Sequence, residues 1–268
     1  MGAYQSGEGA LIRPLHLTEF GHHHSKRPYN MKIEIIHTLA ILLLVLGTSC
    51  DSEKMVSTAV EKQIANNVPP EYTQDNENIV VVTVGTASPI PGERAQTGTA
   101  IFVNGYFFMF DIGAGVVQKS ENMGLPLDEL DGIFLTHYHS DHITDLPNMI
   151  SRSWQRGRTD DLNIYGPQGL TQLMRSVDGF LEIDNSYRLA HHGIEVMDTV
   201  YADGVVHEFS IEQNAYQTIY EKAGIKITAF DVTHEPIEPA VGYAVEYNGK
   251  RVVLSGDTKK NDLVAEMA

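Results

Sequence analysis

Three histidines and one aspartate fall within six consecutive positions of this sequence. They are His137, His139, Asp141 and His142, in the run Leu-Thr-His-Tyr-His-Ser-Asp-His-Ile over positions 135–143. Imidazole and carboxylate groups together suit zinc, and manganese and iron also accept them. This density of ligands predicts a metal site.

The spacing of these ligands indicates how they would be shared between two ions. Residues 132–136 are typical of a short buried strand, and in extended backbone residues two apart point the same way, so His137 and His139 can hold one ion together. A helix that begins near Asp141 turns Asp141 and His142 elsewhere, where they can hold a second ion about 3.5–4 Å from the first. The alternative is an exposed polar turn that is rich in histidine.

Several other segments occur in an order that matches a known family. These segments are Val-Val-Val-Thr-Val-Gly-Thr-Ala-Ser-Pro over 80–89, Phe-Asp-Ile-Gly-Ala-Gly over 110–115, Ile-Tyr-Gly-Pro-Gln-Gly over 164–169, His-Glu-Pro from 234 and Ser-Gly-Asp-Thr over 255–258. Together with the His-x-His-x-Asp-His motif, they resemble the ribonuclease Z and arylsulfatase-like branch of the metallo-β-lactamase superfamily. The resemblance covers about residues 79–268 and implies an α/β fold, the αββα sandwich, with its C-terminal part truncated.

The resemblance also implies a set of metal ligands. Residues matching His137, His139 and His234 hold the first metal in that family, residues matching Asp141 and His142 hold the second, and a carboxylate at the position of Asp257 bridges both. A last histidine near the family's C-terminus completes the second site. Because this sequence has no match for it, we expect a truncated form whose second metal binds more weakly than the first.

Asp111 lies among the glycines of Asp-Ile-Gly-Ala-Gly and is predicted to orient a ligand histidine by a hydrogen bond. Asp141 and Asp257 are the predicted catalytic residues. When ionised, each accepts hydrogen bonds and would orient a hydroxide held between two divalent ions, zinc by preference. Such a hydroxide exists near neutral pH, since binding to a metal lowers the pKa of water from about 15.7 to about 7.

This chemistry predicts a metal-dependent hydrolase that cleaves a small phosphodiester or sulfate ester. Three alternatives remain open: a lactonase or β-lactamase-type hydrolase, a tRNA 3′-processing endonuclease like ribonuclease Z, and a metal-binding protein without turnover. The formal net charge of −16 argues against a long nucleic acid as partner, because affinity for nucleic acids depends on Lys and Arg neutralising phosphates. A small-molecule ester is the predicted substrate.

An apolar run over 39–46 precedes the sole cysteine, Cys50. It is shorter than the roughly 20 residues that span a bilayer and is typical of a signal-peptide core. Small residues before Cys50 resemble a bacterial lipobox, which predicts a lipid anchor at Cys50 and a periplasmic or outer-surface lipoprotein of the cell envelope. The predicted organisation is a mis-assigned upstream segment over 1–30, a lipoprotein-type signal peptide over 31–50, a polar tether over 51–78 and the hydrolase domain over 79–268.

Strands and helices alternate within the predicted domain. The dipeptides Asn104-Gly105 and Asn248-Gly249 are typical of type I′ turns and predict two hairpins. The histidines at 191 and 192 lie in a segment, 187–203, for which no element is predicted. The predicted strands are 79–84, 99–103, 106–111, 225–233, 241–247 and 251–254, and the predicted helices are 116–123, 143–156, 169–180 and 261–267.

Overall fold

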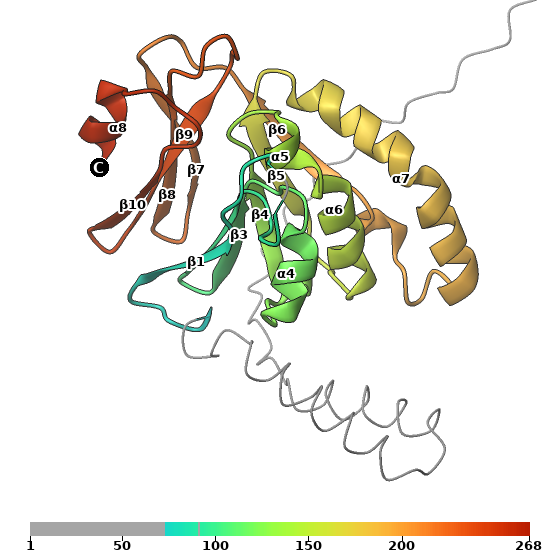
Figure 1. Cartoon of the computed structure of the whole chain (residues 1–268). Coiled ribbons are helices and arrows are strands. Elements are labelled where there is room, and N and C mark those ends of the chain that lie inside the picture. Colours follow the sequence, from blue (N-terminus) through green and yellow to red (C-terminus); the bar gives the residue numbers. More distant parts are fainter. Residues whose placement is uncertain (1–72, 91) are drawn as a thin grey trace, which may run out of the picture. The chain divides into compact units, whose positions relative to one another are not determined.

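The structure is a computed structural model that describes residues 73–90 and 92–268. The predicted segments 1–30 and 31–50, with Cys50, lie outside the described residues, as does the predicted tether up to residue 72. Within the part that is described, no helix is long and apolar enough to cross a membrane. Two β-sheets lie side by side there, and helices flank them (Figure 1).

The first sheet has six strands in the order β1-β2-β3-β4-β5-β6. Its first two pairings are antiparallel and the other three are parallel. Parallel neighbours need crossover connections, and helices supply them. The strands are β1 (Ile79–Gly85), β2 (Gly98–Val103), β3 (Tyr106–Phe110), β4 (Leu130–Phe134), β5 (Leu162–Pro167) and β6 (Gly204–Phe209). The helical segments between them are α4 (Val116–Asn122), η1 (Leu127–Glu129), α5 (Ser140–Ile143), α6 (Leu146–Gln155), α7 (Leu170–His192) and η2 (Thr199–Tyr201).

The second sheet is antiparallel throughout, in the order β10-β9-β8-β7. Its strands are β7 (Tyr216–Lys222), β8 (Ile225–Asp231), β9 (Val241–Tyr247) and β10 (Lys250–Leu254), and α8 (Asp262–Met267) follows. The Asn-Gly turn between β9 and β10 has φ 49° at Asn248 and 69° at Gly249, which confirms the predicted I′ geometry. Residues 255–258, which follow β10, therefore lie at the same end of the second sheet as the loop after β8.

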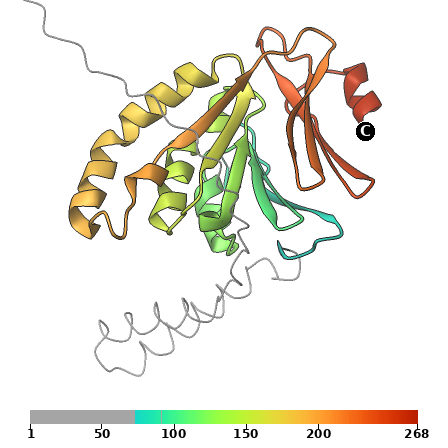
Figure 2. The ribbon, with the colours of Figure 1, turned by 180° about the vertical axis from the view of Figure 1, so that it is seen from behind.

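Apolar cores between neighbouring layers hold the described part of the chain together. The inner faces of the two sheets meet at aromatic and aliphatic side chains such as Phe108, Phe134 and Tyr243, all under 2% exposed. A second core lies between the first sheet and its helices, and a third lies between the second sheet and α8. The order helix, sheet, sheet, helix is visible from both sides (Figures 1 and 2) and confirms the predicted αββα architecture.

Two predicted helices differ from those observed. The helix expected over 143–156 is divided into α5 and α6, because Asp145 leaves helical geometry (ψ 3°) and Pro147 lies in the first turn of α6, where a missing N–H costs nothing. The helix expected to end at residue 180 continues to His192. Beyond Leu181 it runs along the surface with Ile183 and Tyr187 exposed, so no apolar stripe marks it in the sequence.

Candidate metal centre

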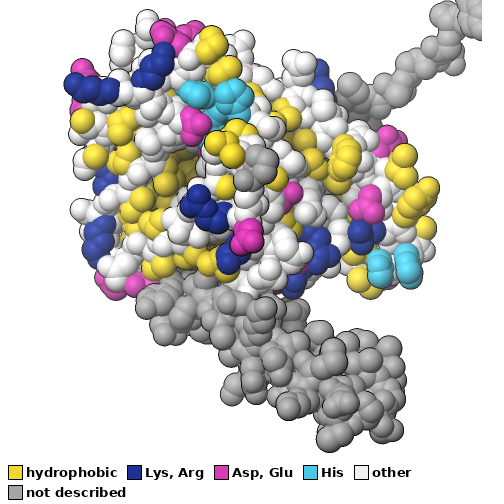
Figure 3. Space-filling model, in the orientation of Figure 1, with side chains coloured by type: hydrophobic (Ala, Val, Ile, Leu, Met, Phe, Trp, Pro, Cys, Tyr) yellow, Lys and Arg dark blue, Asp and Glu magenta, His cyan; other side chains and the backbone are white. Residues whose placement is uncertain are grey.

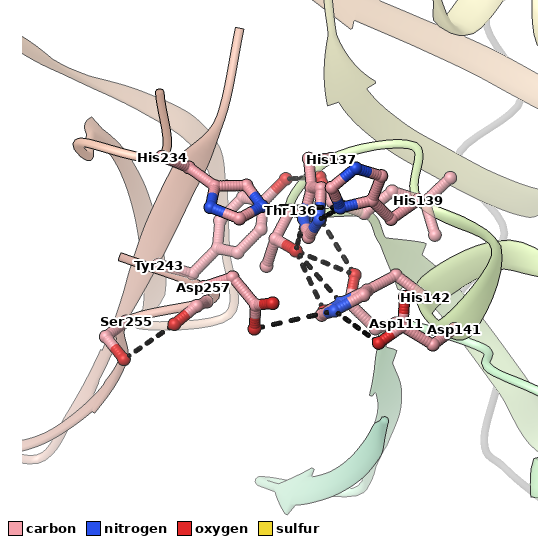
Figure 4. A network of polar contacts seen from close by, with 12 residues as sticks. Asp111, Thr136, His137, His139, Asp141, His142, His234, Tyr243, Ser255 and Asp257 are labelled. Carbon is pink, nitrogen blue, oxygen red and sulfur yellow. Dashed lines mark hydrogen bonds and ion pairs between the residues drawn. The ribbon is translucent and has the colours of Figure 1, made fainter. Parts of the chain in front are cut away.

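The ligand-bearing run follows β4 directly, at the edge where the two sheets meet. His137 and His139 lie in the short segment between β4 and α5, with His139 in extended backbone, and Asp141 and His142 lie on α5. The second sheet contributes His234 from the loop after β8 and Asp257 from the turn after β10. Figure 4 shows these two side chains facing the histidines of the first sheet, and in Figure 3 a group of histidines reaches the surface beside an acidic side chain.

Three imidazole rings form the first cluster. Nε2 of His137 lies 3.0 Å from Nδ1 of His139, which lies 3.3 Å from Nε2 of His234. One nitrogen from each ring falls within 4.8 Å of the others. Burial lowers the pKa of His137 to about 3, and the neighbouring His142 adds to this effect. The ring is therefore neutral and keeps a lone pair that a cation can accept.

The second cluster shares His137 with the first and adds His142 and Asp257. Nε2 of His142 lies 3.5 Å from a carboxylate oxygen of Asp257 and 3.7 Å from one of Asp141. This nitrogen is buried, and it has no hydrogen-bond partner among the described residues. A buried polar atom without a partner is costly in a folded protein, and a metal ion would satisfy it. The donor set of imidazoles and carboxylates therefore fits the divalent cations that the sequence predicts.

Asp111 contacts Nδ1 of His142, the ring nitrogen that faces away from the two clusters. Its carboxylate accepts a 2.8 Å hydrogen bond from Nδ1 of His142, which confirms the predicted supporting contact. Burial opposes protonation of His142, but this hydrogen bond and the charges of Asp111, Asp257 and Asp141 outweigh it and raise the pKa of His142. With Nδ1–H donating to Asp111, Nε2 is the nitrogen left to face the cluster.

Thr136 is a second supporting residue, which the sequence did not predict. Its backbone N–H and its hydroxyl both donate to Asp111, at 2.8 and 2.9 Å, and the hydroxyl accepts from Nδ1 of His137 at 3.1 Å. The pair Asp111 and Thr136 thus directs Nε2 of both His137 and His142 into the clusters. The signal in the sequence is a threonine directly before the first histidine of the motif, but threonine is so common in strands that its presence there does not indicate this role.

The loop that carries Asp111 also supports α5. Ile112 donates its backbone N–H to the carbonyl of His142 at 2.7 Å and accepts from the N–H of Asp145 at 3.0 Å. The next residue, Gly113, lies so close to α5 that a Cβ there would be 2.0 Å from the carbonyl oxygen of Asp141. Glycine at position 113 therefore allows the approach that places α5 against this loop.

The segments that carry His234 and Asp257 are tied to each other and to the first sheet. The N–H of Lys259 donates to the carbonyl of Thr233 at 2.8 Å, and Thr258 accepts from the N–H of Thr233 at 3.2 Å. Across the sheets, the N–H of Val241 donates to the carbonyl of Thr136 at 3.0 Å. Backbone contacts therefore hold both halves of the site in one arrangement.

The structure thus brings five of the six predicted ligands into the two clusters. Asp141 lies beside His142 rather than within either cluster. The histidines at 191 and 192 are exposed at the C-terminal end of α7 and belong to neither cluster.

Comparison with known proteins agrees with this geometry. Residues 107–268 match the Beta-lactamase superfamily domain. The chain belongs to the metallo-β-lactamase superfamily. Within this superfamily it lies in the ribonuclease Z branch: it is 34% identical over 184 residues to Ribonuclease Z of Mycobacterium avium and 33% identical over 204 residues to Ribonuclease Z of Mycobacterium marinum.

These alignments cover 67% and 71% of the chain, and 63% and 67% of the two relatives, respectively. The chain therefore spans about two thirds of their length. The crystal structure of human tRNase Z, short form, shares the metallo-β-lactamase fold with this chain, with a TM-score of 0.53 at 22% sequence identity, covering 66% of this chain and 68% of that one.

One prediction is corrected by these similarities. The net charge of −16 predicts that a long nucleic acid is an unlikely partner, and the similarity of the chain to proteins named Ribonuclease Z contradicts this prediction. Net charge is a sum over the whole chain, whereas a polyanion responds to the potential at the site itself. Charges far from the centre therefore do not decide what reaches it.

Proposed function

We propose that this protein is a metal-dependent hydrolase that cleaves a phosphodiester bond of RNA, with the 3′ extension of a precursor tRNA as its substrate. The observation that carries the proposal is the pair of ligand clusters that share His137, together with the buried Nε2 of His142. This nitrogen has no hydrogen-bond partner in the described part of the chain and lies 3.5 Å from Asp257 and 3.7 Å from Asp141. The similarity to proteins named Ribonuclease Z supplies the substrate class.

In this proposal His137, His139 and His234 hold one divalent ion. His142 would hold the second ion, with carboxylate oxygens of Asp257 and Asp141 lying 3.5 and 3.7 Å from its Nε2. Zinc is the ion that suits three imidazoles best, and manganese and iron are the alternatives. When bound, a pair of such ions supplies a nucleophile from water near neutral pH and polarises the bond under attack.

The residues of the chain then have three tasks. Asp141 and Asp257 would accept hydrogen bonds from the attacking water and orient it toward phosphorus. Asp111 and Thr136 hold the rings of His137 and His142 by their Nδ1 atoms, so that neither ring turns away. No side chain has to act as a covalent nucleophile.

The reacting group in this proposal is a phosphodiester within RNA, whereas the sequence predicts a small phosphodiester. Cleavage of sulfate esters, lactones and β-lactams stays a prediction that no feature of the site favours over the phosphodiester. A small phosphodiester such as bis(p-nitrophenyl) phosphate serves as a probe of the chemistry alone.

A direct test is to incubate the protein with a precursor tRNA that carries a 3′ extension, in zinc or manganese, and to map the products on a gel. We expect cleavage that EDTA abolishes and that His139→Ala reduces below detection. His191→Ala is the matched control, because it removes an exposed histidine outside both clusters and is expected to cleave normally. An intact precursor after incubation with protein that binds metal would contradict the proposal.

A further inference from the structure

The two turns of the second sheet that carry ligands differ in charge. His234 is followed by Glu235 and Glu238, both exposed on the loop between β8 and β9. Asp257 is followed by Lys259 and Lys260, both exposed on the turn before α8. The rim of the metal centre is therefore acidic beside one ligand and basic beside the other.

Lys259 has a fixed backbone and a loosely held side chain. Its N–H donates to the carbonyl of Thr233, one residue before His234, and Thr258 bonds the same residue from the adjacent position. Its ammonium group lies 3.2 Å from a carboxylate oxygen of Glu235, and the two side chains are 62% and 63% exposed. Ion pairs this exposed contribute little to stability, so a phosphate can replace the carboxylate at little cost.

We propose that Lys259 binds a phosphate group of the RNA next to the bond that is cleaved, and that this phosphate displaces Glu235. The RNA backbone then passes the metal centre beside Lys259 and Lys260, where its phosphate takes the place of the Glu235 carboxylate. An ammonium group forms a charge-assisted hydrogen bond to a phosphate oxygen, whereas a carboxylate at the same distance repels the phosphate. This inference rests on the proposed function, and it identifies the part of an acidic protein that receives a polyanion.

The test compares Lys259→Ala with Lys226→Ala. Lys226 is a matched control, because it also pairs with a glutamate, Glu246 at 3.6 Å, but lies at the opposite end of β8 from His234. Binding of precursor tRNA is measured by fluorescence anisotropy in EDTA at several salt concentrations, and KM and kcat are measured with the metal-loaded protein.

We expect Lys259→Ala to weaken RNA binding roughly tenfold at low salt and to reduce the slope of log K against log salt by about 1, as for the loss of one phosphate contact. The loss of affinity should raise KM and leave kcat unchanged, and Lys259→Arg should keep most of the affinity. Glu235→Gln should tighten binding about two- to threefold, because it removes the group that competes with phosphate. Lys226→Ala should bind like the unmodified protein.

Equal affinities and equal salt slopes for Lys259→Ala and Lys226→Ala, in a protein that still cleaves the precursor, would overturn this inference and leave the proposed function standing. Weaker binding by Glu235→Gln would overturn it as well. If the unmodified protein neither binds nor cleaves RNA, the proposed function fails and this inference fails with it. Both lysines are exposed, so neither substitution is expected to affect folding, which thermal unfolding will check.

Discussion

The two sheets contribute to the metal centre in different ways. The first sheet offers His137 and His142, which are 1% exposed and whose second ring nitrogens are held by Thr136 and Asp111. The second sheet offers His234 and Asp257 from surface turns, and the side chain of Asp257 is 49% exposed. The ligand side chains of the first half are therefore fixed by the core before any ion binds, whereas the exposed side chain of Asp257 can adjust on a backbone that is itself held in place. Changes in the first half should affect folding and metal binding together, whereas changes in the second should affect metal binding alone.

The largest effect is expected for His137→Ala, because His137 belongs to both clusters. Its loss should weaken the binding of both ions. RNA cleavage should fall on the order of 10³-fold, the scale seen when one group that stabilises charge is removed from an active site. Metal content by mass spectrometry and single-turnover cleavage are the measurements. Retention of two ions per chain in this variant would show that the two clusters do not depend on the shared ring.

Asp111→Asn is expected to have the second largest effect. The amide cannot accept from His142 and Thr136 as the carboxylate does, so metal affinity should fall roughly 10- to 100-fold. Because these bonds are buried, the metal-free protein should also lose about 1–3 kcal/mol of its free energy of unfolding. Urea unfolding in EDTA measures the second effect, and an unchanged midpoint would mean that the first half of the site is not fixed by the core.

Asp257→Asn tests the second sheet, where we expect metal binding to change without a change in the stability of the metal-free protein. We expect weaker binding of the second ion and a loss of cleavage of about 10²-fold, the lower end for removal of one charge-stabilising group. The urea midpoint of the metal-free protein should stay nearly the same, since the side chain of Asp257 is half exposed and substitutions of exposed side chains change stability little. A clear drop in that midpoint would remove the contrast between the two sheets.

The smallest effect is expected for Tyr138→Phe. The hydroxyl of Tyr138 donates to the carbonyl of Pro167 at the end of β5 and anchors the ligand run from its other side. Its removal should cost about 1 kcal/mol of unfolding free energy, the net worth of one hydrogen bond, and reduce cleavage no more than a few-fold. Thermal unfolding and kcat provide the readings, with Tyr187→Phe on the exposed face of α7 as the control.

Much of the fold can be predicted from the sequence, because the patterns that indicate its turns and strands are local. The dipeptides Asn104-Gly105 and Asn248-Gly249 specify I′ turns through the positive φ that both residues of the turn require, and both hairpins are observed. The second half of α7 cannot be predicted in this way. It is held by its own backbone and by local pairs such as Arg188 with Asp184 at 2.7 Å, so no apolar period distinguishes it from a loop.

The sequence by itself determined which groups can bind a metal. The spacing His-x-His-x-Asp-His after a strand identifies four candidate ligands in one short segment. The family resemblance added His234 and Asp257 from outside that segment. Only the tertiary structure decided that Asp257 joins His137 and His142 while Asp141 lies beside them, and that Thr136 supports two rings at once. The physical reason is that a ligand set is defined by distances of a few ångströms between atoms, here from two sheets whose relative placement depends on the packing of their aromatic core.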